Sequence, residues 1–188
     1  KRQYRASSAG YHTSSAYAIA PADTLRIETL GGHTYALIEG ALSTSNTYAE
    51  EFQRGSTSKT NLTVATDVAA SPTGTTTADR LTASLVDGTH LAAANLSVTN
   101  GATYVGDVFV QAGTETVVQL AALTRWPSGA YVNFNLANGT LSAGADVAGA
   151  WIIPAGGSWY RIGMAVTATS GGSGPIRLLH TNNNLSLI

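Results

Sequence analysis

The residues that could do acid–base or metal chemistry are few, and they are scattered along the chain. There are four histidines: His12, His33, His90 and His180. None of them falls in the His-x-His or His-Glu-x-x-His spacing that is typical of zinc sites, and the sequence contains no cysteine. We therefore interpret all four as surface or loop residues and predict no metal ligand.

Paired carboxylates are the other possible source of catalysis, because many glycosidases place two of them around the scissile bond. Asp107 and Glu115 could face each other across neighbouring strands, although a polar strand face and a turn explain them more simply. Glu50 and Glu51 are adjacent, so they project in different directions on a helix or a strand. The sequence also contains no G-x-S-x-G motif and no phosphate-binding loop. We predict no catalytic residue and expect the protein not to be an enzyme.

One segment combines an aromatic ring with side chains that form hydrogen bonds. Trp126 lies in a turn-rich sequence, Arg125-Trp-Pro-Ser-Gly129, where a large ring is difficult to bury. Exposed aromatic faces stack on sugar rings, and polar side chains beside them bind the hydroxyl groups. We therefore predict a glycan-binding site made of Trp126, Arg125, Tyr131 and Asn133. We interpret the other two tryptophans, Trp151 and Trp159, as packing residues.

These residues belong to a chain of unusual composition. Ala, Thr, Gly and Ser make up roughly half of the 188 residues, and only 11% are charged, against about 25% in ordinary globular domains. The formal net charge is −1. Nucleic-acid binding needs a basic surface, so we expect no nucleic-acid partner. No stretch approaches the ~18 uninterrupted apolar residues of a membrane span, so we expect no membrane insertion.

Hydrophobic alternation predicts a protein built from short β-strands. Nine are expected, at residues 62–68, 80–86, 91–98, 104–111, 116–123, 130–136, 151–153, 159–168 and 175–180. In the 104–111 strand, one face contains Tyr104, Val108 and Val110, and the other contains Val105, Asp107, Phe109 and Gln111. In the 130–136 strand, the expected core-facing residues are Val132, Phe134 and Leu136.

Turn signals rich in Gly and Asn separate these strands, and no long amphipathic helix interrupts them. We therefore predict an all-β protein, an antiparallel β-sandwich or jelly roll, over residues 59–188. Residues 1–58 are predicted to form an irregular N-terminal extension for mounting or oligomerisation, with at most a helical turn around 47–52. The chain begins with Lys1 rather than Met, so we expect a processed or tagged boundary there.

Several sequence segments resemble a sandwich module of bacteriophage tail-fibre and head-spike proteins, and they follow one another in the same order as in that module. The most distinctive, at residues 61–81, contains SPTGTTTADRL; further phrases are NGATYVGDVFVQAG (100–113), VNFNLANGT (132–140) and GSWYRI (157–162). Upstream, residues 4–11, 20–27 and 36–41 resemble the leader that precedes this module. The resemblance spans nearly the whole chain.

The resemblance implies a virion surface protein of a tailed phage or gene-transfer particle, as a head spike or a tail fibre. Its fold would be related to jelly-roll carbohydrate-binding modules, and its expected role is attachment to host cell-surface polysaccharide. Its expected partners are other virion structural proteins and copies of itself, as a trimer or a pentamer. The alternatives are a structural decoration protein without ligand and a binding module of a carbohydrate-active enzyme.

We expect no cofactor, although a structural calcium ion is possible in a jelly-roll sugar binder. The loop carboxylates that could bridge such an ion are Asp67, Asp79 and Asp146.

Overall fold

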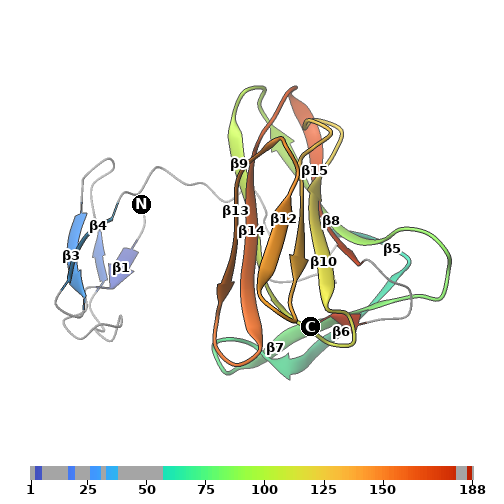
Figure 1. Cartoon of the computed structure of the whole chain (residues 1–188), viewed down its shortest axis with the longest axis horizontal. Helices are drawn as coiled ribbons and strands as arrows, with labels where there is room; N and C mark the ends of the chain where they lie inside the picture. The colour runs from blue at the N-terminus through green and yellow to red at the C-terminus, as the bar shows by residue number, and fades with distance from the viewer. Residues whose placement is uncertain are drawn as a thin grey trace. The chain divides into compact units, whose positions relative to one another are not determined.

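The computed structural model describes residues 57–180 and, outside this range, only the backbone of five short strands (Figure 1). These strands are β1 (Gln3–Arg5), β2 (Tyr17–Ile19), β3 (Arg26–Leu30), β4 (His33–Leu37) and β16 (Ser186–Leu187). β1 pairs with β2 and β3 pairs with β4, in both cases antiparallel. The chain divides into two compact units, Lys1–Thr44 and Ser45–Ile188. The helical turn predicted around 47–52 and the first histidine, His12, lie outside the described residues.

The second unit is an antiparallel β-sandwich, which confirms the predicted fold class. Its strands are β5 (Thr57–Thr60), β6 (Leu62–Ala70), β7 (Thr76–Ala83), β8 (His90–Val98), β9 (Thr103–Gln111), β10 (Val117–Ala122), β11 (Tyr131–Asn135), β12 (Thr140–Ala143), β13 (Val147–Pro154), β14 (Trp159–Thr167) and β15 (Gly172–His180). The described part of the chain contains no helix, and hence none with the length and apolarity to cross a lipid bilayer.

Three sheets build the sandwich. The largest has six strands in the order β12-β11-β10-β15-β8-β5, and a three-stranded sheet, β13-β14-β9, packs against it. A further sheet, β16-β7-β6, contributes Leu81 to the same core. Figure 1 shows the six-stranded sheet and the β13-β14-β9 sheet side by side, with β6 and β7 across one end of them. The predicted boundary at residue 58 falls within β5, which pairs with β8.

The core lies between the six-stranded sheet and the β13-β14-β9 sheet, and its side chains come from alternate positions of each strand. The largest fully buried apolar side chains are Phe134, Ile162, Met164, Val110, Val118, Val132 and Val166. Both faces predicted for β9 and the core-facing residues predicted for β11 are confirmed. Alternation therefore also determines which side chains of β9 and β14 point outward.

All nine predicted strands are present, but some bounds differ. β7 begins at Thr76 and ends at Ala83, whereas the prediction ran to residue 86. The two apolar residues beyond its end, Leu85 and Val86, are exposed in a loop instead. The short strands β5 and β12 were not predicted. β12 has only four residues and all of them are exposed, so it lacks the alternation that identifies a strand.

Candidate ligand-binding face

Trp126, the ring expected at the surface, is buried in the core with 6% of its surface exposed. Its ring meets that of Tyr104 edge to face, with the centroids 5.4 Å apart. It also lies close to β15, because a Cβ added at Gly174 would come within 2.9 Å of the indole Nε1. The expected exposure is therefore wrong, because β9 and β15, distant in sequence, pack around this turn. A buried indole offers no face to a sugar ring.

Of the three residues predicted to accompany Trp126, only Arg125 lies beside it, because a Cβ built on Gly174 would meet both the indole Nε1 and the Arg125 side chain. Arg125 is partly buried, and its backbone carbonyl accepts a hydrogen bond of 2.8 Å from the amide of Thr169. Tyr131 and Asn133 instead lie on the outer face of the six-stranded sheet. There Asn133 accepts a hydrogen bond of 2.8 Å from Gln119, and Tyr131 is 39% exposed. The glycan-binding role of these residues stays a prediction, but it lacks the aromatic ring on which it depended.

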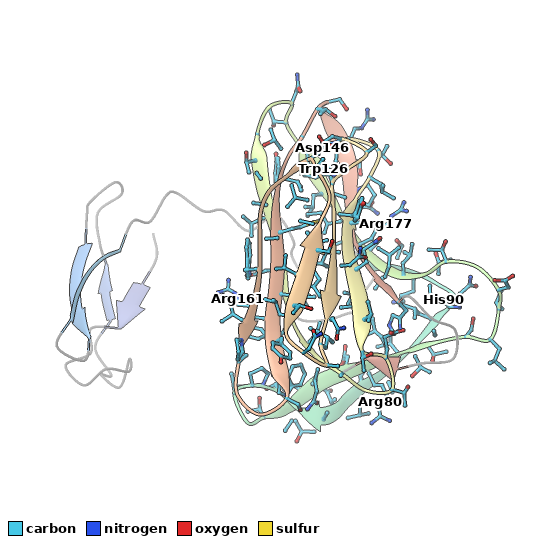
Figure 2. The ribbon with its side chains drawn as sticks, in the orientation of Figure 1. Arg80, His90, Trp126, Asp146, Arg161 and Arg177 are labelled. Carbon is cyan, nitrogen blue, oxygen red and sulfur yellow. The ribbon has the colours of Figure 1, made fainter. Side chains whose placement is uncertain are left out.

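A different surface has the composition expected of a sugar-binding site. It lies on the outer side of the β13-β14-β9 sheet, and we call it the β14 face. It consists of Val105, Asp107, Phe109, Trp151, Ile153 and Arg161. Half of the surface of Val105, Phe109 and Ile153 is exposed, at 48%, 49% and 49%. Figure 2 shows Arg161 on this side of the sandwich and Arg177 on the opposite side.

The strand register arranges these side chains in two adjacent rows across the sheet. In one row Phe109 and Ile153 flank Arg161 from the two neighbouring strands. In the next row Gly163 stands between Asp107 and Trp151. With strands about 4.8 Å apart and rows about 6.8 Å apart, the backbone positions of Phe109 and Trp151 are about 12 Å apart across the face. This span is longer than one sugar ring, so the face suits an oligosaccharide segment.

The indole of Trp151 lies directly over the backbone of Gly163 on the neighbouring strand. A Cβ built on Gly163 would be 2.6 Å from the indole Nε1 and closer still to Cε2 and Cζ2. No residue other than glycine leaves room for the ring in this position. Trp151 is consequently half-buried, with its ring held against the sheet, whereas Trp159 is buried with 8% exposure. The packing role expected of Trp159 is consistent with its burial, and Trp151 contributes to the β14 face.

An ion pair forms the polar centre of the β14 face. The Arg161 guanidinium donates to one carboxylate oxygen of Asp107 from both Nε, at 2.7 Å, and Nη2. The two side chains are 49% and 31% exposed. Because both remain accessible, each keeps capacity to bind a hydroxyl group, the carboxylate as acceptor and the guanidinium as donor. The sequence predicts that Asp107 and Phe109 share a strand face, but it cannot show that Arg161 and Trp151 join them.

A second group of polar residues is buried at the six-stranded sheet. His90 and His180 are directly paired across β8 and β15, and their side chains are 2% and 7% exposed. Their predicted position at the surface or in loops is therefore wrong, because their strands continue into the core. Glu115 is 1% exposed, and its carboxylate accepts a hydrogen bond from the amide of Val117 at 3.1 Å.

Burial lowers the pKa of the His180 imidazole below its ordinary value of 6.5. The Glu115 carboxylate raises the pKa of His180 in part, and His90 lowers it further. Both ring nitrogens of His180 are buried without a hydrogen-bond partner among the described residues. The cluster therefore favours a neutral His180 in the folded protein.

Asp107 and Glu115, the two carboxylates considered for catalysis, lie apart. Asp107 points outward on the β14 face while Glu115 is buried beside His180, so they do not form an acid/base pair. Asp79 accepts a hydrogen bond from the amide of Asp67 at 3.1 Å, whereas Asp146 lies at the end of the sandwich near Trp126 (Figure 2). Among the described residues, no group of three or more His, Asp or Glu side chains could hold a metal ion.

No protein-family model matches the chain, and no curated protein matches it significantly.

Proposed function

We propose that the chain is a surface spike or fibre protein of a phage-like particle and that its β-sandwich binds host cell-surface polysaccharide. The polysaccharide would lie across the β14 face. The proposed role is binding without cleavage, in an assembly with copies of itself and with other virion proteins. The alternatives are a structural protein without ligand and a binding module of a carbohydrate-active enzyme.

Two observations support the class of protein. The antiparallel β-sandwich over β5 to β15 is the architecture that the resemblance to phage spike and fibre modules implies. The chain is also poor in charge, at 11%, as are the surfaces that proteins bury in assemblies. Fold alone does not imply a ligand, so the glycan proposal depends on the β14 face.

The observation that carries the proposal is the arrangement of aromatic and polar groups on one exposed sheet face. Phe109 is half exposed, and the half-buried Trp151 is held against Gly163 on the same face. Between them the Arg161–Asp107 pair offers donors and acceptors. Aromatic rings bind the apolar faces of sugars, and a few fixed polar groups determine their orientation. A flat, accessible face of this kind suits a long polymer better than a deep pocket does.

Co-sedimentation with a panel of bacterial capsular polysaccharides and lipopolysaccharides tests this proposal. The variants Phe109→Ala and Trp151→Ala are compared with Tyr131→Ala, which removes an exposed aromatic ring from the opposite outer face. We expect retention of the wild type and the Tyr131 variant, loss of at least tenfold in affinity for the two β14-face variants, which corresponds to about 1.4 kcal/mol or more, and unchanged polymer length.

The other outcomes distinguish the alternatives. Absence of binding to any polymer, together with self-association that Phe109→Ala abolishes, would mean that the β14 face is a contact between copies. Shortened polymer would mean that the chain is an enzyme. Loss of binding only in the Tyr131 variant would place the ligand on the six-stranded sheet.

A further inference from the structure

Among the described residues, the β14 face offers no unpaired positive charge, and this property restricts the class of polysaccharide. We infer that the ligand of this face is an uncharged glycan rich in 6-deoxy or N-acetyl sugars, rather than a uronic-acid polymer. This inference rests on the proposed function and adds the chemical class of the ligand to it.

Arg161 is the only cation that the described residues contribute to the β14 face. Its guanidinium is already bound by Asp107 through two donor nitrogens. A carboxylated sugar would have to displace Asp107 or approach it, and two carboxylates that share one guanidinium repel each other. A sugar hydroxyl has neither difficulty, because it can donate to Asp107 and accept from Arg161 at once.

The described part of the sandwich also has no excess of positive charge. Residues 57–180 contain five cations, Lys59, Arg80, Arg125, Arg161 and Arg177, and six carboxylates, Asp67, Asp79, Asp87, Asp107, Glu115 and Asp146. Their net charge is therefore −1 with neutral histidines. Long-range attraction of a polyanion needs a positive field, and the net charge of residues 57–180 does not favour one.

Exposed apolar surface lies beside the ion pair. Val105, Phe109 and Ile153 are each about half exposed, and they lie around the Arg161–Asp107 pair rather than scattered over the surface. Ordinary hexoses present hydroxyl groups at most positions, whereas the methyl groups of 6-deoxy and N-acetyl sugars can cover apolar side chains. Each buried methyl group contributes about as much as a methylene, which corresponds to roughly a fourfold gain in affinity.

The test compares each acidic polysaccharide of the binding panel with the same polymer after carboxyl reduction, which removes the charge and keeps the backbone. Neutral 6-deoxy-rich and N-acetylated polymers are measured beside them at low and high salt. We expect neutral polymers to bind about tenfold more tightly than acidic ones, with little dependence on salt. Carboxyl reduction should improve binding. Asp107→Asn, which removes the carboxylate charge beside the Arg161 guanidinium, should shift the preference toward acidic polymers.

The results separate this inference from the function on which it rests. Salt-sensitive binding of an acidic polymer that is lost on carboxyl reduction and in Phe109→Ala would overturn the inference and leave the proposed function intact. If no polymer of either kind binds, the proposed function fails, and the inference fails with it. Leu85→Ala, which removes an exposed apolar side chain from a loop outside the β14 face and outside the site predicted around Trp126, is the matched control throughout, and it should leave the preference unchanged.

Discussion

The position of Trp151 depends on Gly163. Substitution of Gly163 by alanine therefore perturbs the β14 face by a single methyl group, directly beneath the indole. A Cβ at this position would lie 2.6 Å from the indole Nε1, and ordinary contact begins at 3.4 Å. The ring would therefore have to move away from the sheet by about 1 Å or more. We expect Gly163→Ala to lower the free energy of unfolding by about 1–3 kcal/mol, as overpacking does in other proteins.

Gly149 provides the matched control, because it lies on the strand next to Gly163 and opposite Ala165. A Cβ there would find only the methyl group of Ala165, at 3.8 Å, which is an ordinary contact. We expect Gly149→Ala to be neutral or to stabilise the fold by up to about 1 kcal/mol, because alanine restricts the unfolded chain.

The assay is denaturant unfolding at neutral pH, with tryptophan emission recorded for both folded variants. Only Gly163→Ala should shift the emission of the folded state, because it displaces the one half-buried indole. Equal stability of the two variants with unchanged emission would refute the packing of Trp151 on Gly163.

Three further predictions concern His180, Trp126 and Asp146. Because burial lowers the pKa of His180 below 6.5, the unfolded chain binds more protons below this pH, and stability should fall from about pH 7 to about pH 5. His180→Gln should flatten this decline in denaturant unfolding, and an equally steep decline would contradict the assignment. Trp126→Ala should cost about 3–5 kcal/mol of stability, and a cost below about 1 kcal/mol would show that the indole is not packed. Asp146 accepts a hydrogen bond of 2.9 Å from the amide of Gly129, so Asp146→Ala should cost about 1 kcal/mol, and an unchanged midpoint would mean that solvent replaces this bond.

The strands could be predicted from the sequence because their alternation is local. In β9, residues 104–111 alternate between core and surface, and the structure places Val110 inside and Phe109 outside as the pattern indicates. β12 has no such pattern, because its four residues are all exposed.

The candidate site could not be predicted in the same way, because it depends on strand register. Trp151 and Arg161 join Asp107 and Phe109 only through the pairing of β13, β14 and β9, and pairing is a property of the folded sheet. Trp126 was expected outside because turn residues surround it.

The burial of the histidines also depends on strand pairing, which the sequence does not show. His90 and His180 are 90 residues apart in sequence, yet they are direct partners across β8 and β15. No spacing motif identifies such a pair. A signal was nevertheless present. His180 is the last residue of the predicted 175–180 strand, and His90 directly precedes the predicted 91–98 strand, so continuation of that strand by one residue places it in the core.

The proposed function depends on whether polysaccharide covers the β14 face. The most direct measurement is a fluorescence titration of the wild type and Trp151→Phe with the polysaccharide that co-sediments best, because Trp126 and Trp159 are buried and Trp151 is half-buried. We expect a saturable change in wild-type emission that is absent from Trp151→Phe, while Trp126→Phe retains it. An emission change that persists undiminished in Trp151→Phe would place the ligand elsewhere and contradict binding at the β14 face.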